Sequence, residues 1–392
     1  MRTVRIRADE LLLRPWLPTD AEAVCRACQD PLLHRWVSGL PWPYRISDAA
    51  AFVGELAPRW LADGGALHLG VFAGEAGEEG EELLGSVALN AIDRAAGTAE
   101  IGYWTAPWAR GRRVAERAGR ALLEWAFGGG QAPPGSETKA TGLGLARVDW
   151  RATVGNHASR LTALRLGFTI IGERPGAGPA GPDRWLAYLL PGELTAAGTD
   201  VPDPVRRTAR TFAGAHPTLA AAEVTLRPPT REDVPGIVEC RRDPETARWF
   251  GVPQPYTRQD ALVHVERNVP RRWARGAEAV FAIAGAGDAY VGSIDLRIRA
   301  ADAGVGEIGF AVAPRSRGRG YAGAAVREIC RWGFAELGLS RIEWRAEAGN
   351  DASRRVAEKA GFTVEGLLRQ ALTAGGRRRD CWVGSLVRGE LS

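Results

Sequence analysis

The sequence has no long apolar run, very little lysine and few cysteines. Among its 392 residues, no uninterrupted apolar stretch approaches the roughly 20 residues that a membrane-spanning helix needs. At the N-terminus, three arginines precede a brief apolar run at Leu11–Leu13, which does not resemble a secretory signal. We therefore expect no membrane partner and a cytoplasmic location.

The five cysteines are too few and too scattered to form a disulfide framework or a metal site. Their number is odd, and the chain shows no secretory signal. Cys25 and Cys28 form a single CxxC pair, but no second CxxC or CxxH follows, and the five histidines are dispersed. We predict reduced, structural thiols and no bound metal.

Lysine occurs only at positions 139 and 359 among 51 basic residues, so the net charge of +5 comes from arginine. The arginines alternate with acids along the whole chain and form no polybasic arm. Hydrophobic residues make up 45% and charged residues 25% of the chain, which is typical of a soluble globular protein. We expect no nucleic-acid partner.

The sequence does contain an internal repeat that covers nearly its whole length. Residues 100–115 (EIGYWTAPWARGRRVA) and 307–322 (EIGFAVAPRSRGRGYA) are identical at nine of sixteen positions. Upstream, Asp30 corresponds to Asp243, and downstream Asn156 corresponds to Asn350. A repeat of about 200 residues is too long for a solenoid unit, so each copy is expected to be a domain with its own core.

The chain length also favours two domains, because one hydrophobic core stops growing at roughly 250 to 300 residues. We predict a first domain over residues 1–195, a linker over 196–221 and a second domain over 222–392. The linker is rich in proline and glycine and has room for one short helix. Insertions in the first copy, near 75–82 and 128–142, are expected to be loops.

Hydrophobic periodicity in the second copy predicts an antiparallel meander followed by a strand, loop, helix, strand unit. Strands are expected at 224–227, 279–284, 291–298, 307–312, 341–347, 362–364 and 380–386. Helices are expected at 231–242, 259–274 with an interruption near Pro270, 321–337 and 350–360. This order indicates an α+β fold around one mostly antiparallel sheet.

A loop rich in glycine and arginine joins the strand that ends near Pro314 to the helix that begins at Tyr321. Its backbone N–H groups and the positive end of the helix suit a pyrophosphate. Gly318 and Gly320 let the backbone approach phosphate oxygens, and three arginines of the loop add charged donors. The loop recurs after the same Glu-Ile-Gly strand, which favours phosphate binding over an exposed turn.

The same loop also matches the dinucleotide pattern G-x-G-x-x-G, with Glu343 about 20 residues further on. Three features argue against a dinucleotide site. The loop follows an antiparallel meander, Glu343 falls inside a strand, and the first copy has Arg113 where the second has Gly320. A phosphate-binding loop of the Walker type would need a lysine that this loop lacks.

Together these residues resemble the GCN5-related N-acetyltransferases (GNAT), in particular the RimJ/RimL branch that acetylates protein N-terminal amines. The resemblance covers nearly all of each copy. It implies two tandem GNAT domains, each a mostly antiparallel splayed sheet flanked by helices, with acetyl-CoA or another acyl-CoA as cosubstrate. The matching segments are LRP at 226–228, EIGF at 307–310, the loop residues Arg315, Gly318 and Gly320, the helix residues Asn350, Ser353, Gly361 and Phe362, and GLLRQ at 366–370.

The resemblance also implies roles for individual residues. Glu307 would be the catalytic base, or a strand carboxylate paired with an arginine. Ser353 would donate a proton toward the coenzyme sulfur, or stabilise the helix start. The phenol that many members carry seven residues after the asparagine is replaced by Ala357. The residues that would bind the coenzyme are Val312, Arg315, Arg317, Gly318, Arg319, Gly320, Tyr321, Ala322 and Asn350.

The predicted function is therefore transfer of an acetyl or other short acyl group to a primary amine, by direct transfer in a ternary complex. The acceptor would be a protein N-terminus or a small molecule such as an amino sugar, antibiotic or thiol precursor. A chain that senses acyl-CoA or acts as a scaffold, with little turnover, is the alternative from another class. In the first copy, Trp108 and Arg113 replace Arg315 and Gly320, so we expect impaired coenzyme binding there and an intramolecular pseudo-dimer, with homo-oligomers as a further possibility.

Overall fold

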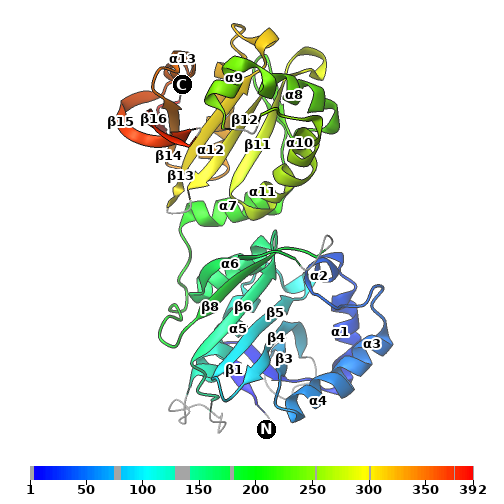
Figure 1. Cartoon of the computed structure of the whole chain (residues 1–392). Helices are drawn as coiled ribbons and strands as arrows, with labels where there is room; N and C mark the ends of the chain where they lie inside the picture. Colours follow the sequence, from blue (N-terminus) through cyan, green and yellow to red (C-terminus); the bar gives the residue numbers. More distant parts are fainter. Residues whose placement is uncertain are drawn as a thin grey trace. The chain divides into compact units, whose positions relative to one another are not determined.

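The computed structural model describes residues 4–74, 81–128, 142–176, 181–251, 254–299, 302–374 and 376–391. They divide into two compact units, Met1–Val201 and Pro202–Ser392 (Figure 1). The insertions predicted near 75–82 and 128–142 lie largely outside the described residues. Each unit is described below by itself.

The first unit combines a sheet with helices that precede and interrupt its strands. Its elements in chain order are β1 (Ile6–Ala8), β2 (Leu11–Pro15), α1 (Ala21–Cys28), α2 (Pro31–Trp36), α3 (Ile46–Ala51), α4 (Ala57–Ala62), β3 (Leu67–Ala73), β4 (Glu82–Asp93), β5 (Thr98–Thr105), α5 (Val114–Phe127), β6 (Arg147–Thr153), α6 (His157–Leu166), β7 (Thr169–Arg174) and β8 (Arg184–Leu189).

The second unit repeats this order after one additional helix. Its elements are α7 (Asp203–Ala213), β9 (Leu219–Ala220), β10 (Thr225–Arg227), α8 (Val234–Arg242), α9 (Pro244–Trp249), α10 (Arg258–Val263), α11 (Val269–Arg275), β11 (Glu278–Ala284), β12 (Tyr290–Arg299), β13 (Asp302–Val312), α12 (Tyr321–Ala335), β14 (Arg341–Glu347), α13 (Asp351–Lys359), β15 (Thr363–Ala374) and β16 (Arg377–Val387).

Each unit contains one eight-stranded sheet with the same topology. The strand order is β1-β2-β3-β4-β5-β6-β8-β7 in the first and β9-β10-β11-β12-β13-β14-β16-β15 in the second. Neighbouring strands are antiparallel except for β5 with β6 and β13 with β14, which are parallel. The predicted α+β fold, with two tandem and mostly antiparallel sheets, is confirmed.

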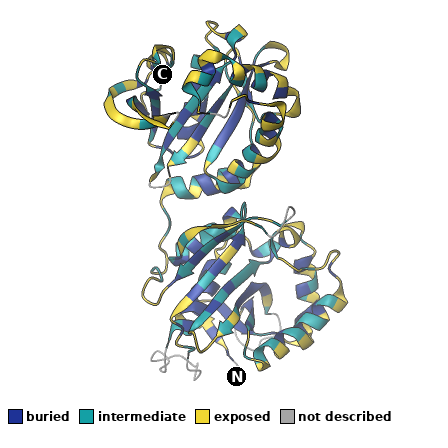
Figure 2. Ribbon diagram, in the orientation of Figure 1, coloured by how far each residue is buried: buried dark blue, intermediate teal, exposed yellow. Residues whose placement is uncertain are grey.

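Helices cover both faces of each sheet, so each unit has two apolar cores. In the second unit, α12 packs over one face with Ile294, Leu296 and Ile308 of the sheet. The helices α8 and α10 cover the other face, where Ile237 and Ala261 are buried. Figure 2 shows the buried residues concentrated along the central strands. Within the described ranges, no helix is both long and apolar enough to cross a bilayer.

The two parallel strands of each unit separate before they end. In the second unit the register of β13 with β14 runs only from Val305↔Arg341 to Ile308↔Trp344, whereas β12 accompanies β13 as far as Val312. In the first unit, β5 and β6 are paired only over Thr98–Glu100. Among the described residues, the end of β13 therefore has a strand partner on one side only, and the sheet opens there.

Two segments differ from the sequence-based expectation. The helix expected to be interrupted or to end near Pro270 does not end there: a π-helical turn, His264–Asn268, precedes this proline, and α11 continues through it. The first unit repeats this arrangement with Phe52–Leu56 before Pro58. The last hairpin, β15 and β16, is longer than expected, since residues 367–371 are exposed and lack the alternation that predicts a strand.

The segment predicted as a linker contains α7, which packs on the second unit. Phe212 of α7 belongs to a core of that unit. The Trp273 indole N–H donates to the Gly214 carbonyl over 3.1 Å, and Arg207 donates to the Ala335 carbonyl over 2.5 Å. The contacts divide the chain between Val201 and Pro202. The boundaries at 195 and 222 stay a prediction, but α7 is structurally part of the second unit.

Candidate functional site

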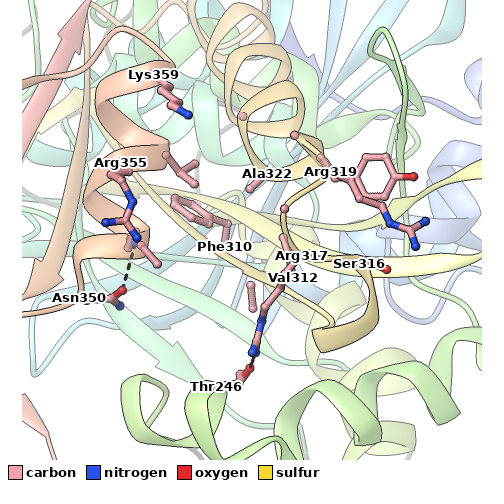
Figure 3. Close-up of a pocket in the computed structure, with 18 of the residues that line it drawn as sticks. Thr246, Phe310, Val312, Ser316, Arg317, Arg319, Ala322, Asn350, Arg355 and Lys359 are labelled. Atoms are coloured by element: carbon pink, nitrogen blue, oxygen red, sulfur yellow. Dashed lines mark hydrogen bonds between the residues drawn. The ribbon is translucent and has the colours of Figure 1, made fainter.

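A pocket of about 510 Å³ lies in the second unit where β13 separates from β14 (Figure 3). Its walls are the end of β13 at Phe310–Val312, the loop 316–320, the first turns of α12, one face of α13, and α9. The pocket therefore joins the gap in the sheet to the loop that was predicted to bind phosphate.

The loop exposes its backbone to this pocket. Gly318 and Gly320 have φ angles of 76° and 83°, in the left-handed region that favours glycine. A Cβ atom at either position would meet nothing within 4 Å, so open space lies beside the backbone. Gly320 is also the residue that precedes α12. A phosphate can approach the N–H groups here without steric obstruction.

Arg317 holds the loop against α9. Its guanidinium donates to the Glu245 carboxylate over 2.6 Å, to the Thr246 hydroxyl over 2.9 Å, and to Asp243. Figure 3 shows the bond to Thr246. Burial tends to raise the pKa of Asp243, but hydrogen bonds from Arg317 and Thr246 lower it overall. The first unit has the corresponding pair, Arg110 with Asp30, so this contact does not depend on an intact glycine loop.

The other two arginines of the loop differ in position. Arg315 forms an ion pair with Glu239 over 3.2 Å, is largely exposed, and does not line the pocket. Arg319 lines the pocket and has no ion pair or hydrogen bond among the described residues. Of the three arginines predicted to contact phosphate, Arg319 is thus the one whose charge remains available.

Three further cations line the pocket that the sequence-based selection missed. They are Arg327 on α12 and Arg355 and Lys359 on α13, and in the described part of the chain none has a hydrogen bond or ion pair. Figure 3 shows Arg355 and Lys359 on one side of the pocket and Arg319 on the other. The sequence did indicate that Arg355 and Lys359 share a helix face, since they are four residues apart. That α12 and α13 bring their cations to the same pocket depends on tertiary packing, which residue spacing does not predict.

Ser353 and Asn350 both line the pocket at the start of α13. Asn350 caps this helix, because its side-chain oxygen accepts the Ser353 backbone N–H over 3.1 Å. The Ser353 hydroxyl accepts the indole N–H of Trp344 over 3.0 Å. Since the hydroxyl oxygen is oriented as an acceptor toward Trp344, its own proton is left to donate elsewhere, and the pocket lies beside it.

Glu307 does not line this pocket. Its carboxylate lies between Arg297, at 3.3 Å, and Arg345, at 3.7 Å. The first unit has the equivalent pair, Arg151 with Glu100, at 2.8 Å. The structure thus contains the ion-paired arrangement that sequence analysis weighed against a role as base.

Asp295 is a partly buried acid that shares Arg297 with Glu307 and that sequence analysis did not select. It lies on β12 opposite Gly309, and Arg297 approaches its carboxylate to 3.0 Å. Burial raises the pKa of Asp295 to about 6, although Arg297 acts to lower it. The register places Ala88 at the corresponding position of the first unit, opposite Gly102. The first unit therefore has no acid at this position.

Aromatic side chains complete the pocket wall. Trp249, Phe250 and Phe310 are among the lining residues. Trp36, at the equivalent position of the first unit, stacks with Arg35 at 4.5 Å. In the first unit Tyr103 replaces Phe310, and its hydroxyl donates to the Ser159 carbonyl over 2.9 Å. The two units therefore differ in polarity beside the equivalent serines.

The pocket residues fit acyl-CoA. A glycine loop with open space beside it and unpaired cations on two helices suits the phosphates, and the apolar end of β13 suits the uncharged arm. Among the described residues, no three His, Cys, Asp or Glu side chains group as a metal site. A glycine-rich loop beside a gap in a mostly antiparallel sheet is the arrangement expected of an acyltransferase.

The acetyltransferase (GNAT) domain family matches residues 10–169 and 223–363. The chain belongs to this family, with one matching domain in each half, and is an N-acetyltransferase. The family assignment and the tandem arrangement predicted from the sequence are confirmed.

Individual relatives are similar to one repeat rather than to the whole chain. "Uncharacterized N-acetyltransferase p20" of Bacillus licheniformis is 28% identical over 176 residues, which is 45% of this chain and 98% of that protein. The "FsC-acetyl coenzyme A-N(2)-transacetylase" of Aspergillus fumigatus is 30% identical over 159 residues, 38% of this chain and 66% of that protein. The solved structure of Mycobacterium smegmatis RimJ in complex with CoA-disulfide is 23% identical, with a TM-score of 0.41 over 45% of this chain and 90% of that one.

Proposed function

We propose that the second unit binds acyl-CoA in its pocket and transfers an acetyl or other short acyl group to a primary amine in a ternary complex. The observation that carries the proposal is the pocket itself, where the open glycine loop, the end of β13 and four cations without a partner among the described residues meet. Family membership supplies the reaction type. Bound acyl-CoA provides an activated thioester.

The chain's own residues would orient the reactants and move protons. The loop at Gly318 and Gly320 would hold the pyrophosphate, together with Arg319, Arg327 and Lys359. The amine nitrogen bonds to the thioester carbonyl carbon, the carbon–sulfur bond breaks, and the amine loses a proton. Ser353 would donate a proton toward the sulfur, since its hydroxyl lies in the pocket wall with its acceptor side bonded to Trp344.

Two roles for Glu307, catalytic base or structural ion-pair partner, make different predictions. A base role for Glu307 predicts that Glu307→Gln lowers kcat at least about a hundredfold, with little change in folding stability. A structural role as the partner of Arg345 predicts instead a loss of unfolding free energy, shared by Glu100→Gln in the first unit. Unchanged turnover in Glu307→Gln would remove this residue from the chemistry.

The acceptor is proposed to be either a protein N-terminal amine or a small-molecule amine. The RimJ/RimL resemblance favours a protein acceptor, and an Asp295 carboxylate near Glu307 suits any acceptor that arrives as an ammonium. Trp249 and Phe250 suit an acceptor with an apolar or aromatic part. Trp249→Ala should then raise KM for the acceptor and leave coenzyme binding unchanged.

Counting bound coenzymes tests the proposal. Native mass spectrometry of the full chain with acetyl-CoA and succinyl-CoA should give one ligand per chain, lost in Gly320→Arg. The fold tolerates this change, because Arg113 occupies the equivalent left-handed position in the first unit, with φ of 52°. Two ligands per chain would overturn the predicted impairment of the first unit. No ligand would refute the proposed site, and binding without acyl transfer would favour the sensing or scaffold alternative.

A further inference from the structure

In the first unit, the positions equivalent to the pocket lining bind other residues of the same chain. The repeat alignment relates four pocket residues of the second unit to four charged residues of the first. Gly320, Gly323, Arg327 and Lys359 correspond to Arg113, Glu116, Arg120 and Arg165. The contacts of these four residues can therefore be compared directly with the pocket of the second unit.

Two of these residues bind the carboxylate of Asp200, which lies after the last strand of the first unit. Arg113 donates through Nη2 to Asp200 Oδ2 over 2.6 Å. Arg165 donates through Nε to Asp200 Oδ1 over 2.8 Å. Each carboxylate oxygen thus receives a charged donor, one from the residue before α5 and one from the last turn of α6. A phosphate group at this place would be bound in the same manner.

The backbone leading to Asp200 is fixed as well. Arg120 donates to the backbone carbonyl of Thr195 and lies 3.4 Å from its hydroxyl. The Thr195 N–H donates to the Leu166 carbonyl over 3.3 Å, and its hydroxyl donates to the Arg165 carbonyl. Residues 195–200 are therefore bonded to α5 through Arg120, to the end of α6, and to Arg113 directly before α5.

The first unit places a second acid beside these arginines, unlike the second unit. Glu116 is buried with its carboxylate 3.7 Å from Arg113 and 3.8 Å from Arg165. Two arginines thus face two carboxylates in the first unit. In the second unit, Gly323 replaces the acid, and Lys359 lines the pocket without a partner among the described residues. A phosphate entering the first unit would have to displace Asp200.

We infer that the first unit retains a phosphate-binding site and that the carboxylate of Asp200 occupies it. The inference rests on the proposed function, which assigns the equivalent positions of the second unit to the coenzyme phosphates. The ligand that this site takes, once the carboxylate is removed, is a pyrophosphate or a nucleotide that carries one, such as CoA. The inference explains the predicted impairment of the first unit by a bound side chain rather than by the size of Arg113 alone.

Calorimetric titration of the full chain with CoA and with inorganic pyrophosphate tests this inference. The double variant Arg327→Glu, Lys359→Glu serves as the background, because it reverses two cations of the second-unit pocket and leaves the first unit unchanged. In this background we expect neither CoA nor pyrophosphate to bind measurably. Asp200→Ala or the isosteric Asp200→Asn, added to this background, should create one site per chain, with affinity for both probes at least tenfold above the detection limit. Glu193→Ala is the matched control, since this exposed acid precedes the same segment and, in the described part of the chain, its side chain accepts only the Leu190 N–H. Glu193→Ala in this background should bind CoA and pyrophosphate no more tightly than the background variant does.

The outcomes separate the inference from the proposed function. Equal binding by the Asp200 variants and by Glu193→Ala, with folding verified by circular dichroism, would overturn the inference. CoA binding in the Arg327→Glu, Lys359→Glu background that is lost on Arg165→Ala would overturn it too, since the first-unit site would be accessible despite Asp200. Absence of CoA binding in the unmodified chain would refute the proposed function, whereas a gain on Asp200→Ala would still show a site in the first unit.

Discussion

Ser353 differs from its counterpart Ser159 in one contact that bears on catalysis. Both serines accept an indole N–H, from Trp344 over 3.0 Å and from Trp150 over 3.3 Å. Only Ser159 also lies beside a phenol, with the Tyr103 hydroxyl at 3.4 Å. The hydroxyl proton of Ser159 therefore has an acceptor within its own unit, whereas that of Ser353 faces the pocket.

Ser353→Ala should lower kcat by roughly ten- to a hundredfold and leave coenzyme binding unchanged, because it removes a proton donor and not a phosphate contact. The cap of α13 stays intact, since Asn350 accepts the backbone N–H of residue 353. Steady-state kinetics with coenzyme titration measures both quantities. Ser159→Ala is the control for the lost indole bond. Equal kcat in the two variants would exclude the acid role.

Asp295 should make the stability of the second unit depend on pH in an unusual direction. Burial raises the pKa of this carboxyl to about 6 from an ordinary value of 3.8. Its contribution is therefore fully present below about pH 4 and is lost as the pH rises through 6. Asp295→Asn should increase the unfolding free energy above pH 6 and have little effect below pH 4. Urea unfolding at several pH values measures this, and a pH-independent difference would contradict it.

At the scale of elements, the cations on α12 and α13 distinguish the pocket from an ordinary helix surface. Arg327 lines the pocket without a partner among the described residues, while Arg331, one turn further along α12, pairs with Glu328 and does not line it. Arg327→Glu should weaken acyl-CoA binding about tenfold, more at low than at high salt, since it reverses a charge near the phosphates. Arg331→Glu should leave affinity unchanged. Similar losses in both variants would indicate a general charge effect.

The loop and its flanking elements were predictable, but the direction of its arginines was not. Gly318 and Gly320 stand out in the sequence, because left-handed backbone and close approach both favour glycine. Arg317, by contrast, was assigned to phosphate and instead bonds Asp243 and Thr246, more than 70 residues earlier in the chain. Such a contact depends on how α9 packs beside the loop, and local spacing carries no signal of it.

The long hairpin shows a second limit of prediction from sequence. The strands β15 and β16 extend well beyond the segments that apolar alternation indicated, because exposed residues on both faces leave no alternation to detect. Asp380 stabilises the extension by accepting the Gln370 N–H over 2.9 Å. Pairing between the two strands, rather than burial, fixes this element.

At the scale of the whole molecule, the position of α7 predicts how the chain can be divided. A fragment of residues 202–392 retains α7, and should fold, bind acyl-CoA and transfer acyl groups as the full chain does. A fragment of residues 222–392 lacks Phe212 and the Gly214 carbonyl that accepts from Trp273. It should lose roughly 2 to 4 kcal/mol of unfolding free energy through the lost apolar contacts. Denaturant unfolding of both fragments measures this difference. Equal free energies of unfolding would support the predicted domain boundary at residue 222.

The ion pair between Arg317 and Asp243 has a consequence for the kinetics of coenzyme capture. Because the first unit keeps the same pair, Arg110 with Asp30, while its glycine loop has changed, the loop owes its shape to α9 or α2 and not to a bound phosphate. A site shaped in advance has little reorganisation to complete during an encounter. The observed association rate in stopped-flow experiments should then rise linearly with acyl-CoA concentration, without the plateau that a slow conformational step imposes.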